Sequence, residues 1–240
     1  MSSSLPNSTD FQLEVQGRKV PCSVWIPYLS TTSSTRPIPL VLVGHGGSGH
    51  KKSQLVLDIA SVLVTQHQIA VAAIDGPVHG DRRTEFVDGP VVRQEFRELW
   101  QKGQSIDPMI EDWQACLNEI LKNTLIDENK IGWYGISMGT AYGLPLVAKE
   151  TRIKVAALGM WGTCRKPNDR LIEDALKISS PVLFQTKNED EIFTPEGQQH
   201  LYDLIASPSK ELRSYPGGHT DPKTEQLEDI VQFLVSHLKK

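Results

Sequence analysis

The sequence has few cysteines: Cys22, Cys116 and Cys164 are the only three among 240 residues. Their odd number and wide spacing argue against a disulfide framework, and no Cys-x-x-Cys pair is present to form a zinc ribbon. The first ten residues have neither the basic nor the apolar part of a signal peptide. Reduced thiols without a secretion signal predict a cytoplasmic protein.

Long apolar runs and dense basic clusters are missing as well. No stretch approaches the roughly 20 apolar residues that a membrane-spanning helix needs, so no membrane span is expected. The formal net charge is −4, and without a cluster of Lys and Arg no nucleic-acid partner is expected. The remaining composition, 39% hydrophobic and 22% charged, suits one soluble α/β domain over residues 1–240.

The most informative segment runs from Ile131 to Thr140. An apolar strand pattern leads into Gly135-Ile136-Ser137-Met138-Gly139, a Gly-x-Ser-x-Gly sequence, and a helical pattern follows. This arrangement is typical of a nucleophile elbow, a sharp strand-to-helix turn with a serine at its tip. The positions two before and two after the serine must be small, because strand and helix approach each other closely there. Ser137 is therefore the candidate nucleophile.

A serine hydroxyl is nearly inert at neutral pH and needs a neighbouring base. His219 follows two glycines after a predicted strand, and it is the candidate base. A third residue, an acid, is needed to orient the histidine ring. The adjacent residues Glu189, Asp190 and Glu191 are the candidates for that acid.

Strand and helix patterns alternate from about residue 39 onward, which predicts a parallel sheet covered on both faces. Residues 11–28 alternate and are rich in valine, which predicts an antiparallel hairpin at the sheet edge. Ser137, Asp190 and His219 each follow a predicted strand. The carboxyl ends of parallel strands share one edge, where ligands bind, so these three residues should meet.

Three features leave alternatives open. Residues 81–107 are charged, with scattered apolar residues and no strand pattern; they form either a small cap over the site or a surface excursion with one helix. Pro145 lies inside the helical pattern after Ser137 and predicts a kink or an early end there. Trp161 follows another predicted strand and is either an apolar wall of the site or ordinary core.

From about Phe11 to the C-terminus the chain resembles an α/β-hydrolase, most similar to the dienelactone hydrolase-like and small serine esterase branches. The motifs that carry the resemblance are Gly44–Gly49, Asp75–Asp81, the elbow at Ser137, Asp190 and His219. The resemblance implies the α/β-hydrolase fold: a mostly parallel central sheet of about eight strands, helices on both faces and a small cap insertion. It also implies that Ser137, Asp190 and His219 act together as a catalytic triad. Among the three adjacent acids, Asp190 best matches the family pattern, Glu189 is the second candidate, and Glu191 is expected to be solvated.

Two N–H groups are needed to stabilise the negative charge that develops on the substrate oxygen. One should be the backbone N–H of Met138, directly after the nucleophile. The resemblance favours Gly47 for the other, with Gly46 second. His45 is expected to orient this loop.

These residues predict a serine hydrolase that cleaves carboxylic esters or thioesters through an acyl-enzyme, with a small-molecule substrate and no cofactor or metal. An acyltransferase or a C–C bond hydrolase could use the same triad. Nothing in the sequence decides between a monomer and a homodimer.

Alternatives from other classes rest on single features. Gly44–Gly49 also spells Gly-x-Gly-x-x-Gly before Asp75, which resembles the fingerprint of an NAD(P)-binding oxidoreductase. A metal site would draw on residues that follow two neighbouring strands, namely His45, His50, Asp75, His79 and Asp81, but their spacing matches no zinc-hydrolase signature. A non-catalytic binding protein on a hydrolase scaffold would usually lack a triad member, and none is missing here.

Overall fold

The inner strands are apolar along their whole length, as strands covered on both faces must be. β3 (Ile38–Gly44) and β4 (Ala70–Ile74) are buried at every residue. The computed structural model describes residues 5–28, 37–85, 87 and 89–240. Residues 1–4 of the N-terminal segment, and residues 86 and 88 of the 81–107 segment, lie outside that part.

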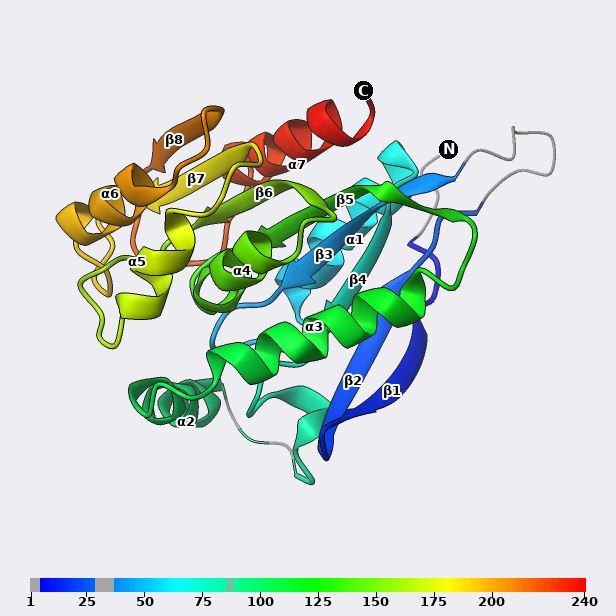
Figure 1. The fold of residues 1–240 in the computed structure, drawn as a ribbon, viewed down its shortest axis with the longest axis horizontal. Coiled ribbons are helices and arrows are strands. Elements are labelled where there is room, and N and C mark those ends of the chain that lie inside the picture. Colours follow the sequence, from blue (N-terminus) through cyan, green and yellow to red (C-terminus); the bar gives the residue numbers. More distant parts are fainter. Residues whose placement is uncertain (1–4, 29–36, 86, 88) are drawn as a thin grey trace.

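Eight strands form one sheet in the order β1-β2-β4-β3-β5-β6-β7-β8 (Figure 1). The six inner and C-terminal strands, from β3 and β4 to β8, pair in parallel. The later ones are β5 (Ile126–Gly135), β6 (Ile153–Gly159), β7 (Val182–Lys187) and β8 (Lys210–Tyr215). The mostly parallel eight-stranded sheet is thus confirmed.

The antiparallel part is the predicted hairpin. β1 (Thr9–Val15) pairs with β2 (Arg18–Trp25), and β2 pairs antiparallel with β4, so the hairpin extends one edge of the sheet. The sheet is therefore mixed, with its antiparallel pairs confined to this edge.

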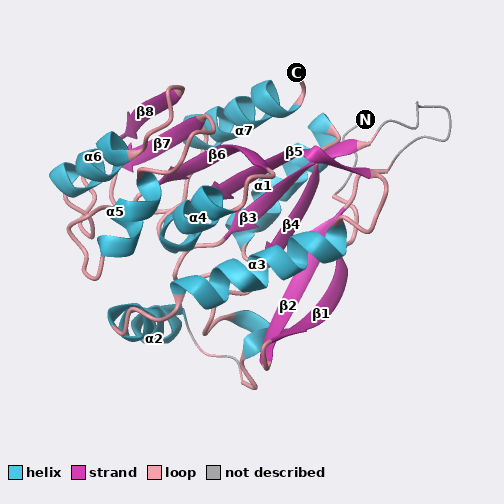
Figure 2. Ribbon diagram, viewed as in Figure 1, coloured by secondary structure: helices cyan, strands magenta, loops and turns pink. Residues whose placement is uncertain are grey.

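Two layers of helices cover the two faces (Figure 2). Successive strand residues point to opposite faces, so Leu40 and Leu42 join one core cluster while Val41 and Val43 join the other. α1 (Gln54–His67) and α7 (Glu225–Leu238) pack on the Val41 face. The other face is covered by α3 (Ile106–Ile120), α4 (Met138–Lys149), α5 (Asp169–Ala175) and α6 (Pro195–Leu204).

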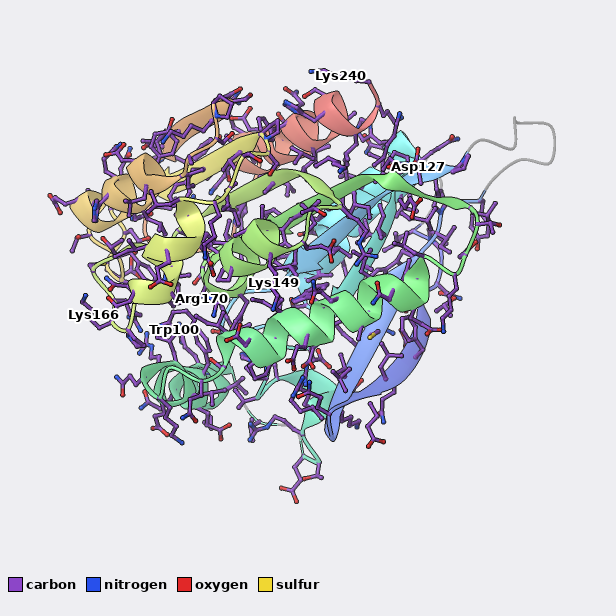
Figure 3. All side chains as sticks on the ribbon, in the orientation of Figure 1. Trp100, Asp127, Lys149, Lys166, Arg170 and Lys240 are labelled. Carbon is purple, nitrogen blue, oxygen red and sulfur yellow. The ribbon has the colours of Figure 1, made fainter. Side chains whose placement is uncertain are left out.

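Among its described residues, the 81–107 segment contains one long helix and the first two residues of α3. After a short 3₁₀ turn, η1 (Gly80–Arg82), α2 (Gly89–Gln101) buries Val92, Phe96 and Trp100, which recur every four residues. Figure 3 shows Trp100 beside the segment that carries Lys166 and Arg170, and its ring lies 5.1 Å from that of Trp161. α2 is therefore docked on the chain that follows β6.

α4 continues through Pro145 to Lys149, so of the two predicted outcomes the early end was wrong, and the kink stays a prediction. Proline removes one helical N–H and crowds the preceding turn. Ten residues of α4 are buried, and packing on this scale outweighs the loss of one hydrogen bond. Among the described helices, none has both the length and the apolar character needed to cross a membrane.

Candidate active site

Ser137 occupies the sharp turn between β5 and α4. Its backbone has φ 54° and ψ −122°, in a region that non-glycine residues rarely adopt. The Ser137 N–H donates to the carbonyl oxygen of Gly159 at 2.9 Å, which ties the turn to the end of β6. Strain held by its surroundings in this way is a feature of functional turns.

The two flanking glycines are required by close backbone contacts. A Cβ atom added to Gly135 would lie 2.7 Å from the carbonyl oxygen of Gly139, and one added to Gly139 would lie 2.6 Å from that of Gly44. Both contacts are to backbone, which cannot rotate away. The close approach of β3, β5 and α4 therefore depends on glycine at both positions.

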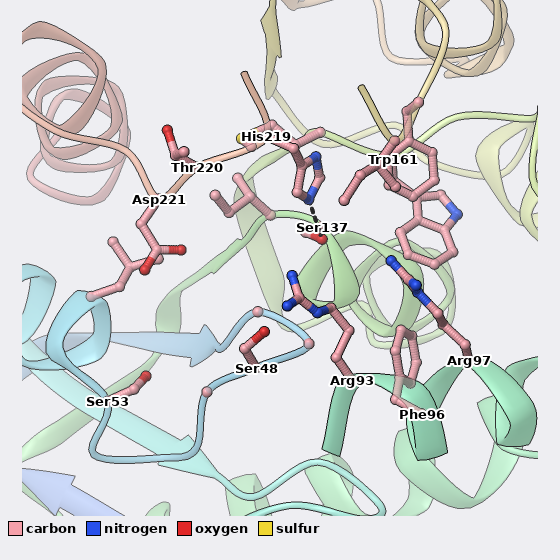
Figure 4. A pocket seen from close by; sticks show the side chains of 18 of the residues that line it. Ser48, Ser53, Arg93, Phe96, Arg97, Ser137, Trp161, His219, Thr220 and Asp221 are labelled. Carbon is pink, nitrogen blue, oxygen red and sulfur yellow. Dashed lines mark hydrogen bonds between the residues drawn. The ribbon is translucent and has the colours of Figure 1, made fainter. Parts of the chain in front are cut away.

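The structure brings Ser137, His219 and Asp190 together at the carboxyl edge of the sheet, and Figure 4 shows the His219 ring directed at Ser137. Ser137 Oγ lies 2.8 Å from His219 Nε2, and His219 Nδ1 lies 2.9 Å from Asp190 Oδ2. Asp190 follows β7 and His219 follows β8, so each arrives on the loop after its strand. With Nδ1–H donating to Asp190, Nε2 is free to accept the serine proton.

The Asp190 carboxylate is fully buried and well supplied with donors. Its Oδ1 accepts hydrogen bonds from the N–H groups of Ile192 and Phe193, at 2.8 and 2.9 Å. Burial by itself would raise the pKa of Asp190, but the hydrogen bonds from His219 and from these N–H groups outweigh it and lower the pKa. Asp190 is therefore held as an anion beside His219.

The neighbouring acids have a different position. Glu189 and Glu191 are both exposed, and their carboxylates accept hydrogen bonds from the loop before and at His219. Glu191 Oε2 accepts from the His219 N–H at 2.8 Å, while Glu189 accepts from the N–H of Gly217. The two glutamates therefore bind the backbone of the loop that carries His219, and neither forms a hydrogen bond with the His219 ring.

The loop after β3 is pinned by His45. His45 Nε2 accepts from the N–H of Gly76 at 2.9 Å, so its Nδ1–H donates to the carbonyl oxygen of Gly46 at 2.8 Å. In a trans peptide the N–H points opposite to the C=O, so the Gly47 N–H is directed away from His45. A Cβ built on Gly47 would lie 3.9 Å from that of Met138, so the two residues predicted to supply the N–H donors are neighbours.

His79 adds a second tie to the same loop. Its Nε2 lies 3.1 Å from the carbonyl oxygen of Gly47. Burial lowers the pKa of His45 to about 4 and that of His79 to about 3. Both rings are therefore neutral near pH 7, and each can donate one N–H to hold a glycine carbonyl in place.

The alternative sites from the sequence do not assemble. Asp75 is fully buried and accepts hydrogen bonds from the backbone and the ammonium of Lys51, which also contacts Asp81 at 2.5 Å. Asp75 is thus unavailable to a ribose. In the part of the chain that the structure describes, no three His, Cys, Asp or Glu side chains are arranged to hold a metal ion.

Comparison with protein families gives a match over residues 28–223 to the dienelactone hydrolase family. The chain belongs to this family. It is therefore an enzyme of the hydrolase class. Comparison with curated proteins found no match.

Solved structures agree with the family assignment. A cold-adapted esterase from an Arctic intertidal metagenomic library, solved as a PEG-bound complex, shares 32% identity at a TM-score of 0.83, covering 98% of this chain and 99% of the other. Two further esterases share the fold. Est1E from Butyrivibrio proteoclasticus has 15% sequence identity and a TM-score of 0.68, covering 96% of this chain and 99% of the other. The Pyrococcus furiosus esterase Pf2001 has 15% identity and a TM-score of 0.69, covering 97% of this chain and 92% of the other.

In this dienelactone hydrolase family member, a cavity of about 210 Å³ opens over Ser137. One wall is aromatic: the Trp161 ring lies 4.6 Å from that of Phe193 and 6.2 Å from that of Phe96. Trp161 is both buried and part of the lining, so the two interpretations of this residue were not exclusive. Phe193 lies 5.5 Å from the His219 ring and continues the wall to the histidine.

The sequence interpretation missed Thr140. This buried side chain accepts the Gly159 N–H at 2.7 Å, and its hydroxyl lies 2.8 and 2.6 Å from the carbonyl oxygens of Gly135 and Gly159. It joins the elbow to β6. No local pattern reveals this role, because Gly159 is far along the chain.

The arginines of the pocket were also missed. Arg93 and Arg97 of α2 and Arg165 after β6 line the same cavity as Ser137. Arg93 and Arg97 are four residues apart, with Phe96 between them. This spacing places Arg93, Phe96 and Arg97 on one face of α2. That spacing was visible in the sequence.

Proposed function

We propose that this protein is a serine hydrolase that cleaves carboxylic esters or thioesters through an acyl-enzyme on Ser137. The observation that carries the proposal is the continuous hydrogen-bond chain from Ser137 Oγ through His219 to the buried anion of Asp190, at 2.8 and 2.9 Å. Membership in the dienelactone hydrolase family and the 32% identity to an esterase support the same reaction.

In the first half of the reaction, Ser137 Oγ attacks the ester carbonyl carbon while its proton passes to His219 Nε2. The negative charge that develops on the carbonyl oxygen is stabilised by the N–H groups of Met138 and Gly47. Asp190 keeps the ring in the correct tautomer and stabilises the imidazolium. The tetrahedral intermediate collapses, the C–O bond to the alcohol breaks, and His219 returns its proton to the leaving oxygen.

In the second half, His219 takes a proton from water as the water attacks the acyl carbon of the Ser137 ester. The same N–H groups hold the oxyanion, the bond to Ser137 Oγ breaks, and His219 protonates the serine again. An alcohol or amine in place of water would make the enzyme an acyltransferase, and C–C bond hydrolysis would draw on the same residues. Adding acyl acceptors to the assay separates transfer from hydrolysis.

The proposal is tested by Ser137→Ala, with Ser48→Ala as the matched control because Ser48 lines the same pocket. A fluorophosphonate probe should label the peptide that contains Ser137 in the native protein and in Ser48→Ala. Turnover of p-nitrophenyl esters should fall by about 10³-fold or more in Ser137→Ala. Ester turnover at the native rate without Ser137 would contradict the mechanism.

Residues 81–107 are proposed to act as a small cap. The support is α2, whose Phe96 lies within 3.4 Å of a Cβ built on Gly47 and faces the cavity over Ser137. A cytoplasmic location is also proposed. All three cysteines are free thiols, and Cys22 and Cys116 are buried, as is common for proteins of a reducing compartment.

A further inference from the structure

In the part of the chain that the structure describes, arginines are paired with acids except at the pocket. Nine arginines lie in the described part of the chain. Six of them form ion pairs with Asp or Glu, namely Arg18, Arg82, Arg83, Arg152, Arg170 and Arg213. Among the described residues, the remaining Arg93, Arg97 and Arg165 have no acidic partner, and all three line the cavity over Ser137.

These three arginines reach the cavity from two elements, α2 and the chain after β6. Arg93 and Arg97 are half-buried, and Figure 4 shows both side chains reaching from α2 toward the space in front of Ser137. The guanidinium of Arg165 lies 5.2 Å from the ring centre of Phe193 and 5.9 Å from that of Trp161. A cation over an aromatic face is restrained there.

The local charge is strongly positive. Among the described side chains that line this cavity, three are arginines and one, Asp221, is a carboxylate; the Asp190 anion lies behind His219 and outside the lining. Burial lowers the pKa of Arg165, and the nearby Arg97 adds a smaller contribution in the same direction.

A monocarboxylate would leave this site with excess positive charge. A phosphate monoester carries about −1.5 to −2 charges near pH 7 and offers three strong acceptor oxygens. Guanidinium groups bind such oxygens in bidentate pairs. Three guanidinium groups opposite three acceptor oxygens therefore suit a phosphate in charge, and they carry enough N–H donors to pair with every oxygen.

We propose that Arg93, Arg97 and Arg165 form a subsite for a doubly charged phosphate group on the substrate. The enzyme then hydrolyses the carboxylic ester or thioester of a phosphorylated small molecule. The phosphate stays intact and anchors the substrate, while the aromatic wall of Phe96, Trp161 and Phe193 covers the part between the phosphate and the scissile ester. This rests on the proposed function for the hydrolysis step, but not for binding of the phosphate.

The test is equilibrium binding of phenyl phosphate and benzoate to the native protein and to Ser137→Ala, measured by calorimetry. We expect phenyl phosphate to bind both proteins, at least tenfold tighter than benzoate. Binding should strengthen from pH 5 to pH 7, because the second pKa of a phosphate ester is about 6. Since Ser137→Ala keeps the arginines, failure of ester hydrolysis and failure of phosphate binding are separate results.

Substitutions identify the subsite. Arg97→Gln and Arg165→Gln should each weaken phenyl phosphate binding at least tenfold, and Arg97→Lys should weaken it less. Arg170→Gln, which removes an arginine paired with Asp107 and Asp174, should leave it unchanged. Circular dichroism verifies that each variant is folded. Equal binding of benzoate would overturn the proposal in favour of a monoanion site, and no binding of either anion would show that the arginines are merely solvated.

Discussion

Three consecutive acids, Glu189, Asp190 and Glu191, take two different roles at the level of single residues. Only the Asp190 carboxylate is buried against the His219 ring, where two backbone N–H groups fix one of its oxygens. The two glutamates hold the backbone of the histidine loop from the exposed side. Burial and donor number, rather than sequence position, decide which of the three faces the base.

Asp190→Asn should lower kcat by about 10³- to 10⁴-fold, because an amide cannot fix the required tautomer or stabilise the imidazolium. Glu189→Gln is the matched control and keeps the acceptor oxygen for the Gly217 N–H, so its kcat should change by less than about tenfold. Steady-state kinetics on one p-nitrophenyl ester gives both values. If the two variants lost activity equally, the orienting role would not belong to Asp190.

The elements that carry local patterns were predictable from sequence. The elbow was visible because its two glycines and the strand-to-helix switch lie within ten residues, and the β1–β2 hairpin because its alternation is local. The continuation of α4 through Pro145 was not predictable, because it depends on how completely the neighbouring elements bury this helix. The contact between the His79 ring and the carbonyl oxygen of Gly47 joins residues 32 positions apart, so no local sequence pattern indicates it.

Thr140 makes an element-scale prediction, because it joins the elbow to the end of β6. Thr140→Val keeps the shape but leaves the Gly159 N–H without its acceptor, so the free energy of unfolding should fall by about 1–3 kcal/mol. Thr140→Ser retains the hydroxyl and should recover most of that loss. Urea unfolding of the three proteins measures the difference. A valine variant as stable as the serine variant would show that the hydroxyl contributes nothing to this junction.

The buried histidines link the site to the stability of the whole molecule. His45 and His79 lie beneath the loop that presents Gly46 and Gly47, and both are kept neutral by burial. Their pKa values in the folded state, about 4 and about 3, are below the ordinary value of 6.5. Between those values the unfolded chain binds protons that the folded chain does not, so stability rises with pH in this window.

The native protein should therefore lose stability as the pH falls from 6.5 toward 4, by up to about 1.4 kcal/mol per pH unit for each histidine. Urea unfolding at pH 6.5 and pH 5.0 should show a loss of up to about 2 kcal/mol from each residue. In His45→Gln the difference in the free energy of unfolding between pH 6.5 and pH 5.0 should be smaller than in the native protein by about that amount. This holds whatever the stability of the variant at either pH. His200→Gln, which removes an exposed histidine, serves as the control, because all other titrating groups are common to the three proteins. If His45→Gln kept the full native pH dependence, His45 would not be neutral in the folded state, and the orientation inferred for the Gly47 N–H would lose its basis.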